Sequence, residues 1–187
     1  MHVLLFFSSL NGSIADLFCP SILTTKKMIK AADILDIPIY ATTQNRARLG
    51  ETCSELSLEK AVTHADKTAF SMWIPEISQH FSSATPSQVV IVGIETHICV
   101  TQTTLDLLAN GHKVYVLADG VSSCNPQEIP IALARLRAAG AVVTTSESFL
   151  YECMGNAAIP EFRAVAGLVK ETSASTKDVM STLLSKM

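Results

Sequence analysis

The sequence predicts an α/β protein of three layers, α-β-α, with a mainly parallel, doubly wound, Rossmann-like sheet. Four short apolar segments are continuous enough to be strands buried on both faces, at residues 3–7, 38–42, 89–92 and 113–117. Segments with the helical spacing of apolar residues lie between them, at 22–35, 99–108 and 129–139. This alternation is typical of right-handed βαβ crossovers, which place helices on both faces of a parallel sheet.

The ends of these elements carry suitable residues. Asn110-Gly111 follows the helix predicted at 99–108, and Gly140 follows the helix predicted at 129–139, where a left-handed residue often ends a helix. A weaker strand is expected at 141–144. The interval 44–74 has no long periodic segment, so we expect an extended loop with short helices there.

One domain accounts for the length and composition. The chain has 187 residues, of which 48% are hydrophobic and 17% charged, enough to bury one sizeable core. We expect the folded domain to cover residues 1–170. The tail 171–187 is rich in Ser, Thr and Lys, and predicts a solvated segment followed by a short helix in an oligomer interface.

Composition also bears on partners and location. The formal net charge of -3 and scattered basic residues argue against nucleic acid as a partner, with stacking on single-stranded RNA as a minor alternative. No segment reaches the roughly 20 apolar residues of a membrane span. The five cysteines form no CxxC pair, which argues against a disulfide framework or a zinc site. We therefore expect an intracellular protein, cytoplasmic rather than mitochondrial, although an organelle stays open.

The position of Cys99 nominates a functional pocket. In an open parallel sheet, ligands bind beyond the carboxyl ends of the strands. The strand 89–92 leads through Gly93 into a helix whose first turn carries Cys99. Helix N-terminal N–H groups favour a thiolate and an oxyanion there. The competing interpretation is a buried cysteine that acts only as a small apolar side chain.

Other polar residues near this pocket are weaker candidates. Lys67 lies in an otherwise apolar stretch, although a surface lysine with a buried stem is the commoner case. His97 is expected at the rim rather than as a base for Cys99. Asp66 is expected to be an exposed loop carboxylate, and Asp119 to cap the turn after its strand.

Three segments together resemble the isochorismatase-like cysteine hydrolases, in the branch of isochorismatase domain-containing proteins. The segments are VVIVGIETHICVTQTTLDLL, DKTAFSMWIP and VLADGVSSCNPQEIPIALARLRAAGAVVTTSES. Their order and spacing are specific, whereas each one alone would be weak. The resemblance runs from about Val3 to Lys170.

The resemblance implies roles for several residues. In this family an aspartate, a lysine and a cysteine form a catalytic triad, which maps the nucleophile onto Cys99 and the lysine onto Lys67. A non-proline cis peptide maps onto Ile94-Glu95 and directs the N–H groups of Glu95 and Cys99 toward one oxyanion. The residues expected around the rim of the pocket are Thr43, Phe70, Trp73 and His97.

The chain departs from the family pattern at the first strand. Alignment on Leu10-Asn11 places Ser9 where the family has its catalytic aspartate. A serine cannot replace that carboxylate as a base, and a general base contributes about 10²- to 10⁴-fold in rate. Asp16 lies seven positions further along, and a capping or surface role is the preferred interpretation for it.

The segment after the second strand also departs from a related pattern. Nicotinamidases of the superfamily bind a divalent metal through an Asp-x-His at this place, whereas this chain reads Thr42-Thr43-Gln44-Asn45-Arg46. We therefore expect neither a metal nor another cofactor, and no nicotinamide hydrolysis.

Two functions follow from the sequence. The first is a cysteine hydrolase acting on a small amide-, imide- or ester-like molecule. The alternative is a catalytically impaired relative that keeps the pocket or the fold for ligand binding or assembly. Because members of the family are commonly dimers or larger, we expect a homo-oligomer.

Overall fold

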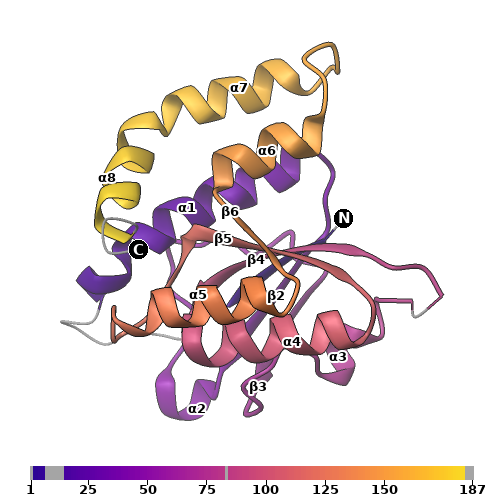
Figure 1. Ribbon diagram of the computed structural model, residues 1–187, viewed down its shortest axis with the longest axis vertical. Coiled ribbons are helices and arrows are strands. Elements are labelled where there is room, and N and C mark those ends of the chain that lie inside the picture. Colours follow the sequence, from indigo (N-terminus) through magenta and orange to yellow (C-terminus); the bar gives the residue numbers. More distant parts are fainter. Residues whose placement is uncertain (1, 7–14, 83, 184–187) are drawn as a thin grey trace.

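A single parallel sheet organises the computed structural model, which describes residues 2–6, 15–82 and 84–183 (Figure 1). The sheet has six strands in the order β3-β2-β1-β4-β5-β6. The strands are β1 (His2–Phe6), β2 (Ile39–Gln44), β3 (Thr63–Lys67), β4 (Gln88–Ile94), β5 (Lys113–Ser122) and β6 (Val142–Thr144). All neighbouring pairs are parallel. The chain moves outward from β1 in one direction and returns beside it with β4, so the predicted doubly wound fold is confirmed.

Helices cover both faces of this sheet. The helices are α1 (Ala15–Ile34), α2 (Arg46–Leu49), α3 (Pro75–Ser78), the π-helix η2 (Thr96–Val100), α4 (Thr101–Ala109), α5 (Glu128–Ala138), α6 (Ser146–Met154), α7 (Phe162–Glu171) and α8 (Ser173–Leu183). In Figure 1, α4 and α5 lie on one side of the sheet, and α1, α6, α7 and α8 lie on the other. Among the described residues, no helix has the length and apolar character to cross a membrane.

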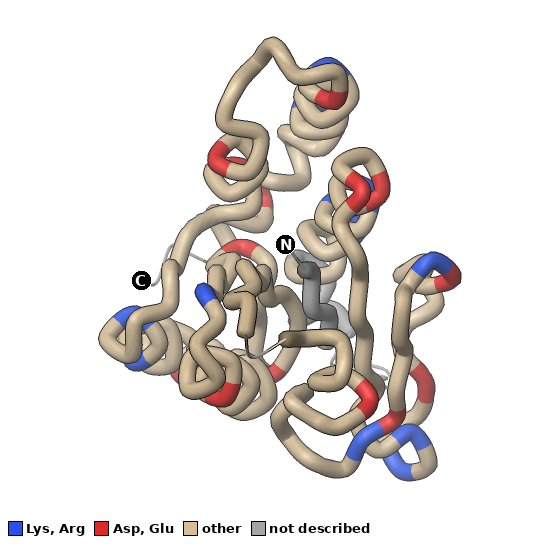
Figure 2. Tube along the Cα trace, turned by 90° about the vertical axis from the view of Figure 1, so that its right-hand side faces the viewer, with Lys and Arg blue, Asp and Glu red and all other residues tan. Residues whose placement is uncertain are grey.

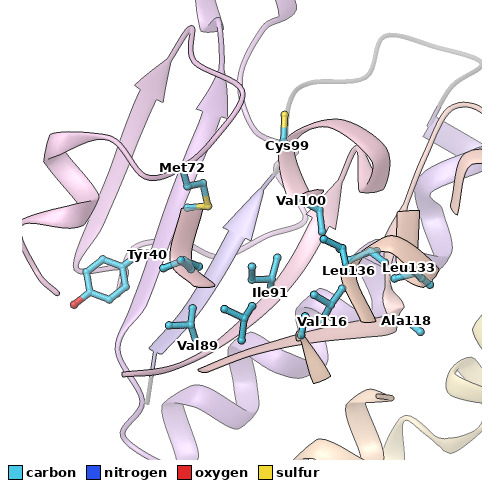
Figure 3. Packing of buried hydrophobic residues seen from close by; sticks show 14 of the residues in the cluster. Tyr40, Met72, Val89, Ile91, Cys99, Val100, Val116, Ala118, Leu133 and Leu136 are labelled. Atoms are coloured by element: carbon cyan, nitrogen blue, oxygen red, sulfur yellow. The ribbon is translucent and has the colours of Figure 1, made fainter. Parts of the chain in front are cut away.

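The two faces of the sheet carry two separate cores. Val89 and Ile91 of β4 belong to one apolar cluster, part of which Figure 3 shows. Val90 and Val92 point the other way into the second cluster. Because successive strand residues face opposite sides, a strand buried on both faces has no polar positions. This explains why the central strands were recognisable as apolar runs.

The segment 44–74 differs from the predicted loop because it contains β3. The residues of β3 are Thr-His-Ala-Asp-Lys, and most of them are partly or fully exposed. As an edge strand of the sheet, β3 pairs with β2 on one side. A search for continuous apolar runs therefore overlooks it, although it carries Lys67 to the carboxyl edge of the sheet.

The C-terminal segment also differs from its prediction. The residues after Lys170 were expected to be solvated before a short terminal helix, but α8 already begins at Ser173. Val179 and Leu183 are buried, and α8 packs against α1 of the same chain. The predicted role of the tail in an oligomer interface stays a prediction.

Buried polar contacts hold α6 and α8 against the face of the sheet that α1 covers. The carboxylate of Asp119 accepts hydrogen bonds from the Ser146 backbone N–H, at 2.8 Å, and from the Ser146 hydroxyl. Asp119 was expected to cap the turn after its own strand. It instead holds the first turn of α6. Lys27 of α1 donates to the Thr176 hydroxyl of α8 at 3.0 Å. Burial lowers the pKa of Lys27, while the nearby Asp119 carboxylate opposes that shift.

Gly120 of β5 gives a test of this packing. A Cβ at this position would lie 2.7 Å from Val92 Cγ1 and 3.2 Å from Thr24 Cγ2, which real structures do not tolerate without movement. Gly120→Ala should therefore lower the free energy of unfolding by about 1–3 kcal/mol in urea titrations. The matched control is Gly167→Ala on α7, where a Cβ meets no atom within 4 Å and should not destabilise. Equal stability of the two variants would contradict this packing.

Candidate active site

Cys99 lies where β4 leads into the helical layer. β4 ends at Ile94, and the π-helix that carries Cys99 begins two residues later and continues directly into α4. The Cys99 residue is only 7% exposed. Figure 3 shows its sulfur pointing away from the core side chains, beyond the end of the sheet. This is the carboxyl edge, where parallel sheets bind ligands.

The backbone around Cys99 directs hydrogen-bond donors at its sulfur. The Ile94–Glu95 peptide bond is cis, at the position where the sequence resemblance places one. The backbone N–H groups of Glu95 and of Cys99 itself lower the pKa of the Cys99 thiol, as donors near its sulfur do. Two donors that converge on one point can stabilise negative charge on sulfur, or on a substrate oxygen beside it.

The Glu95 side chain and Thr96 connect the turn before Cys99 to the segment after β5. Its Oε2 atom accepts a hydrogen bond from the Cys124 backbone N–H at 2.7 Å. The Thr96 backbone N–H donates to the Ser123 hydroxyl at 3.0 Å, and the Thr96 hydroxyl donates to the Ser122 carbonyl at 2.9 Å. The segment after β5 therefore fixes the loop that presents Cys99.

Lys67 brings a buried cation to the same edge of the sheet. It is the last residue of β3 and is 5% exposed. Its Nζ atom donates to the Gln44 side-chain oxygen, to the Ala69 carbonyl at 2.9 Å and to the Phe70 carbonyl at 3.0 Å. Burial lowers the pKa of Lys67, while charge on Cys99 and Asp66 opposes this shift.

Gln44 is a site residue that the sequence did not single out. It ends β2 and pairs in register with Lys67. Its Oε1 atom accepts from Lys67 and lies 4.0 Å from Cys99 Sγ, a long contact for a thiol donor. Its position in the sequence could have identified it. The last residue of a parallel strand lies at the same edge of the sheet as the last residues of the neighbouring strands.

Opposing effects set the charge of Cys99. Burial raises the pKa of the thiol and is the largest effect. The Lys67 charge and the two backbone N–H groups lower it, and the Glu95 carboxylate raises it. Because the net pKa is raised, Cys99 rests as a thiol at neutral pH and must lose its proton before it can attack.

Two of the predicted rim residues are held by other polar groups. Thr43 is completely buried, and its hydroxyl hydrogen-bonds Thr52 Oγ1 at 2.7 Å and His64 Nε2 at 2.8 Å. Since strand side chains alternate, Thr43 lies on the opposite face of β2 from Gln44. His97 Nδ1 lies 3.0 Å from the Ser123 hydroxyl, so the imidazole is directed at the segment after β5.

The other two predicted rim residues lie apart from each other. Phe70 contributes its backbone carbonyl to Lys67, and the residue is 52% exposed at this edge. The Trp73 ring packs 5.5 Å from Phe81 and 5.4 Å from His112, between ring centroids. His112 directly precedes β5, at the amino edge of the sheet. The structure therefore does not bring Trp73 to Cys99.

Ser9, the residue that the sequence resemblance places at the position of the family aspartate, lies outside the described residues. Its place relative to Lys67 and Cys99 therefore stays a prediction. Within residues 2–6, 15–82 and 84–183, no three side chains of His, Cys, Asp or Glu gather as a metal ion would require.

Comparisons with known proteins agree on one family. The family model described as Isochorismatase domain matches residues 18–148. The secreted isochorismatase effector Isc1 of Phytophthora sojae is 43% identical over 153 residues, which are 79% of this chain and 73% of that protein. Isochorismatase domain-containing protein 2 of Xenopus laevis is 37% identical over 156 residues, 82% of this chain and 76% of that protein.

A solved structure gives the same result for the fold. The protein described as MAR1 ribonuclease from Caenorhabditis elegans superimposes with a TM-score of 0.80 at 36% sequence identity. The superposition covers 90% of this chain and 89% of that one.

The electrostatics of the site predict the effect of removing Lys67. Because its charge lowers the pKa of the Cys99 thiol, Lys67→Met should raise that pKa further. Alkylation of Cys99 by iodoacetamide at pH 8 should slow by about tenfold for each unit of the shift. Mass spectrometry of the Cys99 peptide measures this rate. Lys60→Met, which removes an exposed lysine, should leave the rate unchanged, and an equal loss in both variants would contradict the assignment.

Proposed function

Because this chain belongs to the isochorismatase family, we propose that it is a cysteine hydrolase of small amide-, imide- or ester-like molecules. The proposal depends on the groups that surround the Cys99 sulfur. Two backbone N–H groups and the field of a buried lysine act on the same atom. Such a combination favours attack on a carbonyl carbon, which places negative charge first on sulfur and then on oxygen.

The reaction follows from these groups. The Cys99 thiolate attacks the carbonyl carbon, a C–S bond forms, and the carbonyl π-electrons move to oxygen. The N–H groups of Glu95 and Cys99 receive that oxyanion, and Lys67 stabilises the added negative charge. As the carbonyl re-forms, the bond from its carbon to the leaving group breaks, and the leaving group takes up the proton that the thiol lost. Water then hydrolyses the thioester to a carboxylic acid and the free thiol.

The step that this chain supports least is removal of the thiol proton. Ser9 stands where the family has its aspartate, and burial raises the pKa of the Cys99 thiol. These two observations favour a second candidate function, a catalytically impaired relative that keeps the pocket for ligand binding or the fold for assembly. The two candidates differ in turnover but share the pocket.

A third activity is suggested by the description of the Caenorhabditis elegans relative as a ribonuclease. Figure 2 shows basic and acidic residues interspersed along the described chain. The formal net charge is -3, so the electrostatic attraction that carries most nucleic-acid binding is weak. We therefore keep a small molecule as the proposed substrate. If the protein hydrolysed RNA and Cys99→Ser abolished that activity, the small-molecule proposal would be wrong.

Location and assembly remain predictions. The Phytophthora sojae relative is described as secreted, whereas we expect this chain to act inside the cell, in the cytoplasm or in a mitochondrion. We also expect a homo-oligomer. Light scattering that gives a mass near the 20.1 kDa of one chain would contradict this expectation.

Acylation by an activated ester tests the hydrolase. With p-nitrophenyl acetate, the protein should form an acetyl adduct on Cys99 that is hydrolysed with time, and Cys99→Ser should abolish it. Mass spectrometry locates the adduct. The control is Cys124→Ser, because Cys124 is an exposed thiol beside the same Glu95 and its removal should leave the adduct intact. An adduct on Cys124 instead would show that exposure alone decides the reaction.

Restoring the family carboxylate distinguishes the active enzyme from the impaired relative. Ser9→Asp should raise the hydrolysis rate, by as much as about 10²- to 10⁴-fold if the new carboxylate acts as the base. Ser8→Asp supplies the matched control with the same charge one position away. No gain in Ser9→Asp would mean that the pocket has changed by more than this residue.

A further inference from the structure

Gln44 lies between the two groups on which the proposed chemistry depends. Its Oε1 atom accepts a hydrogen bond from Lys67 Nζ and lies 4.0 Å from Cys99 Sγ. The parallel pairing of β2 with β3 sets Gln44 directly opposite Lys67. Both residues end their strands, so their contact follows from the sheet register rather than from the conformation of a loop.

The side-chain amide of Gln44 is held in one orientation. Its Nε2 atom donates to the Thr68 carbonyl at 2.9 Å. Turning the amide by half a rotation would direct its NH₂ group at the Lys67 ammonium and its oxygen at the Thr68 carbonyl. Both contacts would then be repulsive. The amide oxygen therefore faces Lys67 and Cys99.

The contacts of Lys67 suit its charged form. An ammonium group has three N–H donors, whereas a neutral amine has two. The oxygens of Gln44, Ala69 and Phe70 accept three hydrogen bonds from Nζ, which matches the number of donors of the ammonium form. Because these acceptors are neutral, they hold the cation without cancelling its field at Cys99.

We propose that Gln44 is a positioning residue: its amide oxygen holds the Lys67 ammonium beside Cys99 and accepts the hydrogen bond of the resting thiol. This inference rests on the proposed function, in which the Lys67 charge stabilises the thiolate and the oxyanion. A carboxylate at position 44 would pair with Lys67 and cancel that charge. The neutral amide keeps the field on Cys99 in a chain where Ser9 replaces the family aspartate.

The first test replaces the amide by a carboxylate of nearly the same shape. Gln44→Glu should raise the pKa of Cys99 by about one unit, and alkylation by iodoacetamide at pH 7 should fall about tenfold. Gln79→Glu makes the same charge change on an exposed side chain and should alter the rate by less than about twofold. Equal rates in the two variants would overturn the proposal.

A double-mutant cycle tests whether Gln44 acts through Lys67. In the Lys67→Met background, a carboxylate at position 44 has no cation to pair with, and burial keeps it protonated. Gln44→Glu should then slow alkylation by less than about threefold. The same tenfold fall in both backgrounds would mean that Gln44 acts on Cys99 without Lys67, contrary to the proposal.

A measurement on the unmutated protein does not depend on the folding of any variant. In NMR spectra, the side-chain amide signal of Gln44 should shift with pH at the same midpoint as the Cβ signal of Cys99, while that of Gln79 should not. A Gln44 signal that ignores the Cys99 titration would overturn the inference.

The two proposals fail differently in these experiments. A Cys99 that resists alkylation at every pH would contradict its role as nucleophile, and the NMR titration would still test Gln44. Alkylation that responds to Lys67→Met but not to Gln44→Glu would leave the hydrolase standing and remove only the role of Gln44.

Discussion

The parallel direction of the strands is the constraint on which the site depends. Because each strand of the sheet runs the same way, β2, β3 and β4 all end at one edge. Gln44 and Lys67 are the final residues of β2 and β3, and the helix that carries Cys99 begins just after β4. Gln44 and Cys99 are 55 positions apart in the chain, and the ends of their strands bring them together without a long loop. The cores on the two faces fix the strands, and so fix the edge.

The electrostatics of the site are a balance between burial and a few specific contacts. Burial disfavours both the charged lysine and the charged cysteine, and it lowers the pKa of Lys67 while raising that of Cys99. Charge on Cys99 and Asp66 opposes the effect of burial on the pKa of Lys67. The Lys67 charge and two backbone N–H groups oppose the effect of burial on the pKa of Cys99. The resting state is thus a thiol beside a cation, ready for negative charge to develop. For hydrolysis, the site also needs a group that accepts the proton of the Cys99 thiol.

The sequence predicted the parts of the fold that burial makes visible. The central strands and the helices after β4 and β5 were found because they are apolar over several residues. The edge strand β3 was missed because its exposed positions are polar, and α8 was underestimated because Ser and Thr obscure its few buried residues. Cys99 was nominated from its position after a strand and Lys67 from its apolar surroundings, and the family resemblance then gave both residues a role. Gln44 was not nominated, since a glutamine at a strand end is chemically ordinary until its neighbours are known. Thr43 and Trp73 were expected at the rim, yet Thr43 contacts His64 on the other face of β2 and the Trp73 ring packs beside His112.

The proposed hydrolysis requires that the backbone N–H groups of Glu95 and Cys99 form a site for an oxyanion next to a nucleophilic sulfur. A crystal structure of the protein treated with a small aldehyde would show whether this site exists. The thiol of Cys99 should add to the aldehyde carbon to form a hemithioacetal, whose geometry resembles that of the tetrahedral intermediate. The oxygen of this adduct should lie within about 3 Å of both N–H groups. A hemithioacetal whose oxygen points to solvent, or one formed on another cysteine, would contradict the proposed oxyanion site.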